Sequence, residues 1–190
     1  MTKSKIENRK SKIGNIEVAV IVGSDGDLSV MSHTVAVLKE FGIFHEVRIL
    51  SAHRTPKLLE QYVASFGQRK VQVVIAGAGN AAHLAGKIAS LTTLPVIAVP
   101  LDSGSLGGLD ALLSTVQMPG GIPVLTVAIG KAGATNAALA AVEILALNRP
   151  ALARKLANYR RRMANDVARK NAELQQLGVE EYVRKTTSPR

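Results

Sequence analysis

Short apolar runs alternate with longer segments in which apolar residues recur at helical spacing. The runs are rich in Val and Ile, which is typical of strands buried on both faces of a parallel sheet. They predict strands at residues 17–22, 44–50, 71–76, 95–100 and 124–129. Helices are predicted from Leu28 to Gly42, from about Pro56, after Gly79, and in an alanine-rich segment at about 135–147. Strand and helix therefore alternate along most of the chain.

This alternation predicts the α/β fold class, with a single-domain doubly wound parallel sheet of about five strands in the flavodoxin-like arrangement. Beyond Pro150 we expect a long basic helix reaching Leu177, because apolar residues form one stripe at Leu152, Leu156, Tyr159, Met163 and Val167. The expected parts are a basic N-terminal tail (1–16), an α/β domain (17–148), a C-terminal helical extension (149–184) and a disordered tail (185–190).

The composition narrows the available chemistry. The 190 residues include no cysteine, which rules out disulfides, thiolate nucleophiles and cysteine-ligated zinc. The four histidines are scattered, without a pair four residues apart beside a carboxylate, so no metal site is expected. Residues 1–15 lack an apolar core, and no run of about 18 apolar residues occurs, which argues against secretion and a membrane partner. We predict a cytoplasmic protein.

The formal charge of +10 comes from the two ends of the chain. Residues 1–17 carry five basic and two acidic side chains, residues 148–190 carry eleven and four, and residues 18–147 carry eight of each. Aromatic residues, which would stack on bases, make up only 3%, and no nucleic-acid motif is present. Basic tails attract polyanions weakly, but nucleic acid is not the expected partner.

Ligands of an open α/β sheet bind beyond the carboxyl ends of its strands, so candidate residues are sought in the loops that follow them. The first such loop offers Gly23, the Ser24 hydroxyl and Asp27 beside a helix N-terminus, where backbone amides suit an anion or a ribose. The same residues also suit an ordinary tight turn, with Asp27 as the N-cap. Taken alone, this loop favours the turn.

The second loop is the most informative stretch, with the sequence Ser51-Ala52-His53-Arg54-Thr55-Pro56. Histidine is the side chain best matched to proton transfer near neutral pH, and the planar fork of Arg54 suits a phosphate or a carboxylate. In the alternative, structural interpretation, His53 bonds to a backbone carbonyl and Thr55 caps the helix that begins at Pro56.

The third loop, residues 77–84, would place a ligand against backbone amides and presents His83 at a helix start. It matches the permissive G-x-G-x-x-A form of the dinucleotide fingerprint, so nicotinamide binding is an alternative. The match is weak, because that fingerprint normally lies on the first βα turn. Residues 102–123, dense in Gly and Pro, either connect two strands or cover the crevice. His33 and His45 lie away from this edge and are interpreted as structural.

Five motifs occur in a fixed order: G-S-x-x-D from Gly23, S-A-H-R-T-P from Ser51, G-A-G-x-A-A-H-L from Gly77, Q-M-P-x-G-I-P-V from Gln117 and A-I-G-K-A-G-A-x-N-A-A-L from Ala128. Together they resemble the class I N5-carboxyaminoimidazole ribonucleotide mutases over roughly residues 17–147. S-A-H-R-T-P also resembles a sister class that carboxylates aminoimidazole ribonucleotide directly with CO2, although that class usually has Lys after the His. The family commonly has Gly where Asn80 stands and often Ser where Gly26 stands.

The resemblance implies an enzyme of de novo purine biosynthesis that moves a carboxylate from the exocyclic nitrogen to carbon C4 of an aminoimidazole ribonucleotide. It implies that His53 is the general acid and base, that Ser24 and Arg54 lie near the phosphate, and that Asp27 lies near the ribose. The other expected substrate-binding residues are Gly23, Ser51, Ala52, Gly79, His83 and Leu84. The resemblance further implies a homo-octamer whose neighbouring subunits complete each site, with no metal, nucleoside triphosphate or organic cofactor. Direct carboxylation and a non-catalytic nucleotide-binding module are the alternatives.

Overall fold

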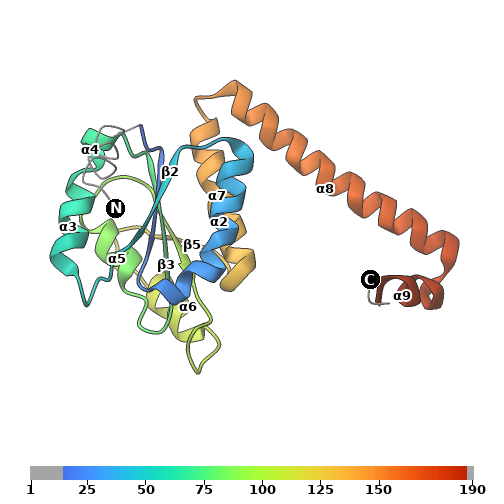
Figure 1. Cartoon of the computed structure of the whole chain (residues 1–190), viewed down its shortest axis with the longest axis horizontal. Helices are drawn as coiled ribbons and strands as arrows, with labels where there is room; N and C mark the ends of the chain where they lie inside the picture. The colour runs from blue at the N-terminus through green and yellow to red at the C-terminus, as the bar shows by residue number, and fades with distance from the viewer. Residues whose placement is uncertain (1–14, 188–190) are drawn as a thin grey trace, which may run out of the picture. The chain divides into compact units, whose positions relative to one another are not determined.

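A parallel sheet forms the centre of the α/β part of the chain in the computed structural model, which describes residues 15–187 (Figure 1). Within these residues it has five strands in the order β2-β1-β3-β4-β5. The strands are β1 (Val18–Val22), β2 (His45–Ile49), β3 (Val73–Ala78), β4 (Val96–Pro100) and β5 (Leu125–Thr126). This is the strand order of the flavodoxin-like doubly wound fold, so the predicted fold class is confirmed.

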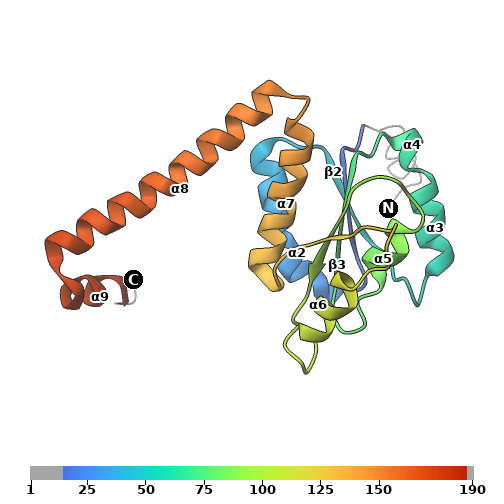
Figure 2. The same ribbon diagram turned by 180° about the vertical axis from the view of Figure 1, so that it is seen from behind.

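Helices cover both faces of the sheet (Figures 1 and 2). One face carries α2 (Leu28–Phe41) and α7 (Gly130–Ala146), and the other carries α3 (Pro56–Ala64), α4 (Phe66–Arg69) and α5 (Leu84–Ala89). The hydroxyl of Thr34 donates to the carbonyl of Ala134 over 2.8 Å, which joins α2 to α7. A short 3-10 helix, η1 (Asp25–Asp27), and helix α6 (Leu109–Val116) follow β1 and β4.

The central strands are buried on both faces. Every residue of β1 and β4 is buried, and successive side chains of a strand point to opposite faces. Ile21 therefore packs into a cluster with Leu59 of α3 and Ile88 of α5, while Val20 faces the other layer. Burial on both faces explains why the strands appear in the sequence as continuous apolar runs. It also fixes the strand ends from which the loops project.

Helix α6 does not appear in the prediction. Its apolar residues Leu109, Leu113 and Val116 do recur at helical spacing, but all three are about half exposed. The Gly-rich segment before the helix and the Gly-rich and Pro-rich segment after it hid that signal. The predicted loop at 102–123 is therefore interrupted by two turns of helix.

Two other boundaries differ from the prediction. Strand β5 is shorter than the strand expected at 124–129, and α7 begins at Gly130 rather than near residue 135. A Cβ atom at Gly133 would lie 1.6 Å from the carbonyl oxygen of Ala128. Gly133 thus permits a close approach between the first turn of α7 and the segment that precedes it, whereas the sequence suggested a loop.

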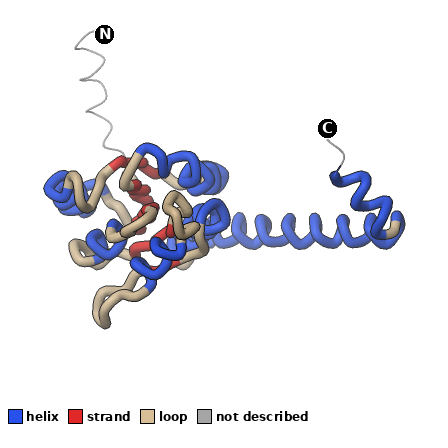
Figure 3. The backbone as a smooth tube through the Cα atoms, turned by 90° about the horizontal axis from the view of Figure 1, so that it is seen from below, coloured by secondary structure: helices blue, strands red, loops and turns tan. Residues whose placement is uncertain are grey.

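A second compact unit follows Leu145 and begins at Ala146. It holds α8 (Pro150–Leu177) and α9 (Val179–Thr187), both drawn as helix in Figure 3. An ion pair between Glu173 and Lys185 joins the two helices. The predicted long helix is confirmed. None of the helices described between residues 15 and 187 combines the length and apolar character needed to cross a membrane.

The expectation of a disordered tail at 185–190 is wrong for residues 185–187, which belong to α9. Acidic residues in the first turn of α9 and basic residues in its last turn complement the helix dipole, and this explains a helix where composition suggested disorder. Residues 188–190, and residues 1–14 of the predicted N-terminal tail, lie outside the described residues.

Candidate functional site

The loops after β1, β2 and β3 meet at the carboxyl edge of the sheet and line a cavity of about 470 Å³. Strand β1 pairs with β2 on one side and β3 on the other, so the direction of strand addition reverses here. Doubly wound sheets bind ligands at such a switch point, and the volume falls within the roughly 300–1,000 Å³ of small-molecule sites. The lining consists of Gly23, Ser24, Gly26, Asp27, Ser51, Ala52, His53, Arg54, Ala78, Gly79, Asn80, Ala81, Leu84 and Ser103.

The structure brings the candidate residues from the three loops together, with one exception. His83 is not on the lining and instead contacts His53. The lining also contains residues absent from the candidate set, including Asn80 after β3 and Ser103 after β4. Their position directly beyond a strand end was the available signal.

The first loop is a capping box that holds Asp27 at the cavity. The backbone amide of Ser24 donates to Oδ2 of Asp27 over 2.9 Å, and the amide of Gly26 donates to the Ser24 hydroxyl over 3.4 Å. Asp27 occupies the N-cap position of α2 but makes no side-chain cap bond, so its expected capping role there is wrong. Burial raises the pKa of the Asp27 carboxyl, although the backbone amides of Ser24 and Gly23 oppose the shift.

The second loop closes on itself through its Ser and Thr. The amide of Ser51 donates to the Thr55 hydroxyl over 2.9 Å, and that hydroxyl donates back to the Ser51 carbonyl over 3.2 Å. Because Thr55 is used in this way, it makes no side-chain cap bond to α3. The closed loop leaves His53 and Arg54 exposed at the cavity, and the alternative in which both His53 and Thr55 are structural is not supported.

Arg54 joins the second loop to the first. Its Nη2 atom donates to the carbonyl of Gly23 over 2.6 Å. Its charge favours the ionised forms of the nearby Asp25 and Asp27, but the pKa of Asp25 is lowered chiefly by the Ser24 hydrogen bond and the pKa of Asp27 is raised chiefly by burial. A guanidinium carries five N–H donors, so one bond to the protein leaves capacity for an anion. The Ser24 hydroxyl lies on the lining of the same cavity, and together these groups suit a phosphate.

The third loop contains a backbone conformation that few residues accept. Asn80 has a φ of 52°, in the left-handed region, where Asn is one of the best tolerated residues after Gly. This explains how Asn can stand where the resemblance leads us to expect Gly. A Cβ at the neighbouring Gly79 would lie 1.9 Å from the Ser103 hydroxyl oxygen, so the loops after β3 and β4 are in close contact.

His53 and His83 form an imidazole pair at the edge of the cavity. Nε2 of His53 lies 2.9 Å from Nδ1 of His83, and the rings meet edge to face at 86° with centroids 5.0 Å apart. One of these nitrogens must donate and the other accept. The arrangement places a group that can take and return a proton next to the anion-binding Arg54. These two groups suit acid–base chemistry on a phosphorylated molecule.

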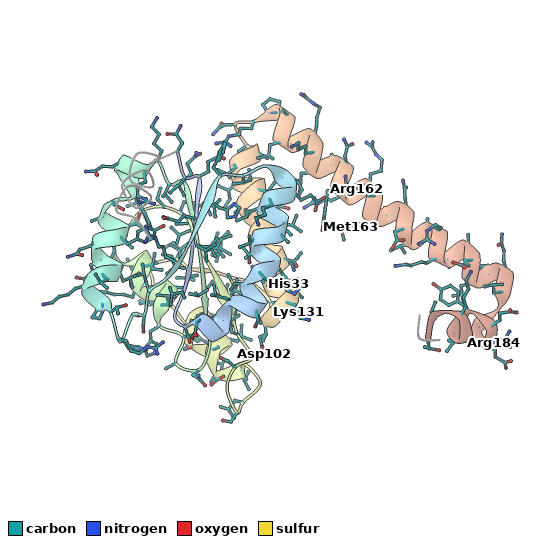
Figure 4. All side chains as sticks on the ribbon, in the orientation of Figure 1. His33, Asp102, Lys131, Arg162, Met163 and Arg184 are labelled. Carbon is teal, nitrogen blue, oxygen red and sulfur yellow. The ribbon has the colours of Figure 1, made fainter. Side chains whose placement is uncertain are left out.

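The other polar features lie apart from this chemistry. His33 projects from α2 and does not line the cavity (Figure 4). The His45 ring bonds to the carbonyl of Ile43 over 2.8 Å, as expected of a structural histidine. Among residues 15–187, no group of three or more His, Asp or Glu side chains is placed to hold a metal ion.

Known proteins are similar to this chain over most of its length. Residues 17–166 match the protein family described as AIR carboxylase. N5-carboxyaminoimidazole ribonucleotide mutase of Thermotoga maritima is 49% identical over 166 residues, which cover 87% of this chain and 96% of the relative. The protein of the same name from Saccharolobus solfataricus is 54% identical over 151 residues, covering 80% and 94%.

Solved structures are also similar to this chain over most of its length. The crystal structure of Treponema denticola PurE has a TM-score of 0.75 to this chain at 28% sequence identity, covering 83% of this chain and 97% of that one. The family match ends at residue 166, within α8, so the rest of α8 and all of α9 extend beyond the matched region.

Proposed function

The chain belongs to the AIR carboxylase family, and from that premise we propose that it interconverts N5-carboxyaminoimidazole ribonucleotide and 4-carboxy-5-aminoimidazole ribonucleotide in purine biosynthesis. Curated relatives about half identical over most of the chain carry the mutase name. The observation that carries the proposal is the placement of His53 beside Arg54 on the cavity at the switch point, across from Ser24 and Asp27. That placement puts a side chain that can transfer protons and a side chain that can bind an anion in one pocket.

In the proposed site, Arg54 binds the phosphate, and the Asp27 carboxylate accepts from the ribose hydroxyls. Ser24 adds a hydroxyl beside the phosphate. The remaining loop residues, Gly23, Ser51, Ala52, Gly79 and Leu84, shape the walls. The imidazole base then lies near His53, which is exposed on the lining and free of the core.

The proposed reaction needs one proton given and one taken. As the bond between the exocyclic nitrogen and the carbamate carbon breaks, CO2 leaves and His53 protonates the nitrogen. Carbon C4 then attacks the CO2 and forms the new carbon–carbon bond. The His53 side chain takes the proton that C4 loses. The two transfers cancel, so one histidine serves both. Holding the CO2 in the pocket between the two steps prevents its loss to solvent.

Direct carboxylation of aminoimidazole ribonucleotide by CO2 would use the same groups, and the names of the close relatives favour the mutase. The discriminating experiment supplies each ribonucleotide in bicarbonate-depleted buffer. We expect rapid conversion of the carbamate and no carboxylation of aminoimidazole ribonucleotide until bicarbonate is added at high concentration. Turnover only with aminoimidazole ribonucleotide and bicarbonate would show the carboxylase. Thermal stabilisation by the ribonucleotide without conversion of the carbamate would show a binding module.

Assembly and cofactor use complete the proposal. We infer a homo-octamer that reacts without a metal or organic cofactor. Half-exposed apolar residues on α6 and β5, namely Leu109, Leu113, Val116 and Leu125, support an interface on the α/β unit. Light scattering should give eight times the 20.1 kDa chain mass, and excess EDTA should leave turnover unchanged. A monomer mass, or activity lost to EDTA and restored by one metal, would contradict these two statements. The cytoplasmic location stays a prediction.

A further inference from the structure

The contact between His53 and His83 joins loops that follow strands on opposite sides of β1. His53 comes after β2 and His83 after β3, and both of these strands pair with β1. The pair therefore bridges the end of β1, at the mouth of the cavity. Of the two rings, only His53 belongs to the lining, and His83 contacts it from outside the lining.

The backbone around His83 is held firmly. Its carbonyl accepts from the amide of Lys87 over 2.9 Å, in the first turn of α5. The amide of the preceding Ala82 donates to the Ser114 hydroxyl of α6 over 3.1 Å. Ala82 and Leu84, on either side, are buried. The backbone of His83 is thus held in place, while its ring is exposed.

His53 is anchored differently. It lies in a loop closed by Ser51 and Thr55, and its ring is exposed. Within residues 15–187, the hydrogen bond to His83 is the one that the His53 ring makes. An exposed imidazole can otherwise rotate about two side-chain bonds, whereas proton transfer requires a defined direction and a defined tautomer.

We propose that His83 is a positioning residue for the proton-transfer step, which holds the ring plane and the tautomer of His53 through the bond between Nδ1 of His83 and Nε2 of His53. Since Nε2 of His53 is occupied by this bond, Nδ1 of His53 is the nitrogen that exchanges protons with the substrate. This inference rests on the proposed mutase function. It differs from the expectation that His83 binds the substrate, because His83 acts through His53.

The test uses two variants of different chemistry. His83→Phe keeps a ring of similar size and removes the hydrogen bond, whereas His83→Asn keeps an amide nitrogen and oxygen near the position of Nδ1. We expect His83→Phe to lower kcat by roughly 10-fold to 100-fold, the usual effect of losing a residue that orients an active group, with KM within about 2-fold of wild type. His83→Asn should recover most of that loss, and thermal unfolding should be unchanged in both.

A double variant separates a positioning role from a direct one. In the His53→Asn background, His83→Phe should cost less than about a further 2-fold, because residues that act as a unit are not additive. Full multiplication of the two effects, or a rise in KM with kcat unchanged, would overturn the inference and make His83 a substrate-binding residue. A kcat for His83→Phe equal to wild type would overturn it as well.

The mutase function itself is read from the wild-type enzyme alone, so its failure cannot be confused with failure of the inference. If His83→Phe does not fold, the ¹⁵N spectrum of the wild-type imidazoles supplies the answer. We expect one protonated and one unprotonated nitrogen at the two facing positions, coupled through the hydrogen bond. Rapid tautomer averaging at both rings, in the presence of the ribonucleotide, would contradict the positioning role.

Discussion

Two carboxylates beside arginines have opposite electrostatic settings in this molecule. Glu46, on the edge strand β2, accepts from the Tyr62 hydroxyl over 2.8 Å and pairs with Arg48 at 2.8 Å and with Arg69. Burial alone would raise the pKa of Glu46, but hydrogen bonds from Tyr62 and Arg48 outweigh it, and the pKa is lowered. Asp27, at the cavity, has its pKa raised, chiefly by burial.

The difference separates a cluster that serves the fold from one that awaits a ligand. Both guanidiniums around Glu46 are paired with its carboxylate, and both also lie over the Tyr62 ring, each with its central carbon 5.4 Å from the centroid. Around Asp27, Arg54 makes its hydrogen bond to a carbonyl and none to a carboxylate among residues 15–187. Because Arg54 is exposed and keeps N–H donors that are not used by a carboxylate, it is available to a bound anion.

Replacement of His53 should have the largest effect. We expect His53→Asn to bind the ribonucleotide but to lose on the order of 10²-fold to 10⁴-fold in kcat, the usual contribution of acid–base catalysis. Steady-state rates and calorimetric binding measure the two quantities. His33→Asn, on α2 and off the cavity lining, is the matched control and should behave as wild type. Near-normal turnover of His53→Asn would remove this residue from the chemistry.

Arg54 and Arg48 test the contrast between the clusters most directly. Arg54→Met should raise KM by roughly 10-fold to 100-fold, since a hydrogen bond to a charged group contributes about 1.5–3 kcal/mol, and should leave thermal stability nearly unchanged. Arg48→Met should leave KM unchanged. It should cost at most about 1 kcal/mol of stability, because this ion pair is partly exposed. Equal effects of both variants on KM would contradict the distinction between a structural cluster at Glu46 and a ligand-binding cluster at Asp27.

The two carboxylates should contribute to stability with opposite pH dependence. The lowered pKa of Glu46 adds stability above its unfolded pKa, and this contribution disappears as the pH falls through the folded pKa. The raised pKa of Asp27 has the reverse sign: folding favours the protonated form, so stability falls as the pH rises through that window. Urea unfolding from pH 3 to 7 should show a weaker acid loss in Glu46→Gln and a steeper net rise with pH in Asp27→Asn. The same pH dependence in both variants would contradict the assignment.

The smallest effect is expected at Asn80. Asn80→Gly should change the free energy of unfolding by less than about 0.5 kcal/mol, because Gly accepts the left-handed conformation but is more flexible when unfolded. Asn80→Ala should cost about 1–2 kcal/mol, the penalty of that conformation for an ordinary residue. Chemical denaturation measures both, and an Ala variant as stable as wild type would show that the loop relaxes.

The sequence predicted what depends on local patterns. Strands such as β1 and β4 are continuous apolar runs, Gly42 ends α2 in a left-handed conformation with a φ of 75°, and Pro56 begins α3. The hexapeptide loop could be located because it follows a strand and precedes a proline.

Features that depend on packing between distant segments could not be predicted. In α6, the flanking Gly-rich and Pro-rich segments hid the helical spacing of Leu109, Leu113 and Val116. Gly133 lies in α7 with the carbonyl of Ala128 close against it, a contact that only the folded chain reveals. The His53–His83 bond joins residues from loops on either side of β1, and no spacing along the chain reveals it.

The central claim is that one carboxylate moves within one pocket, and isotope tracing tests it most directly. The wild-type enzyme is given ribonucleotide with ¹³C in the carbamate, in buffer containing excess unlabelled bicarbonate, for a single turnover. Mass spectrometry of the 4-carboxy product then reports the source of its new carboxylate. The account predicts that the product retains the ¹³C. A product carrying unlabelled carbon from the bicarbonate pool would contradict it.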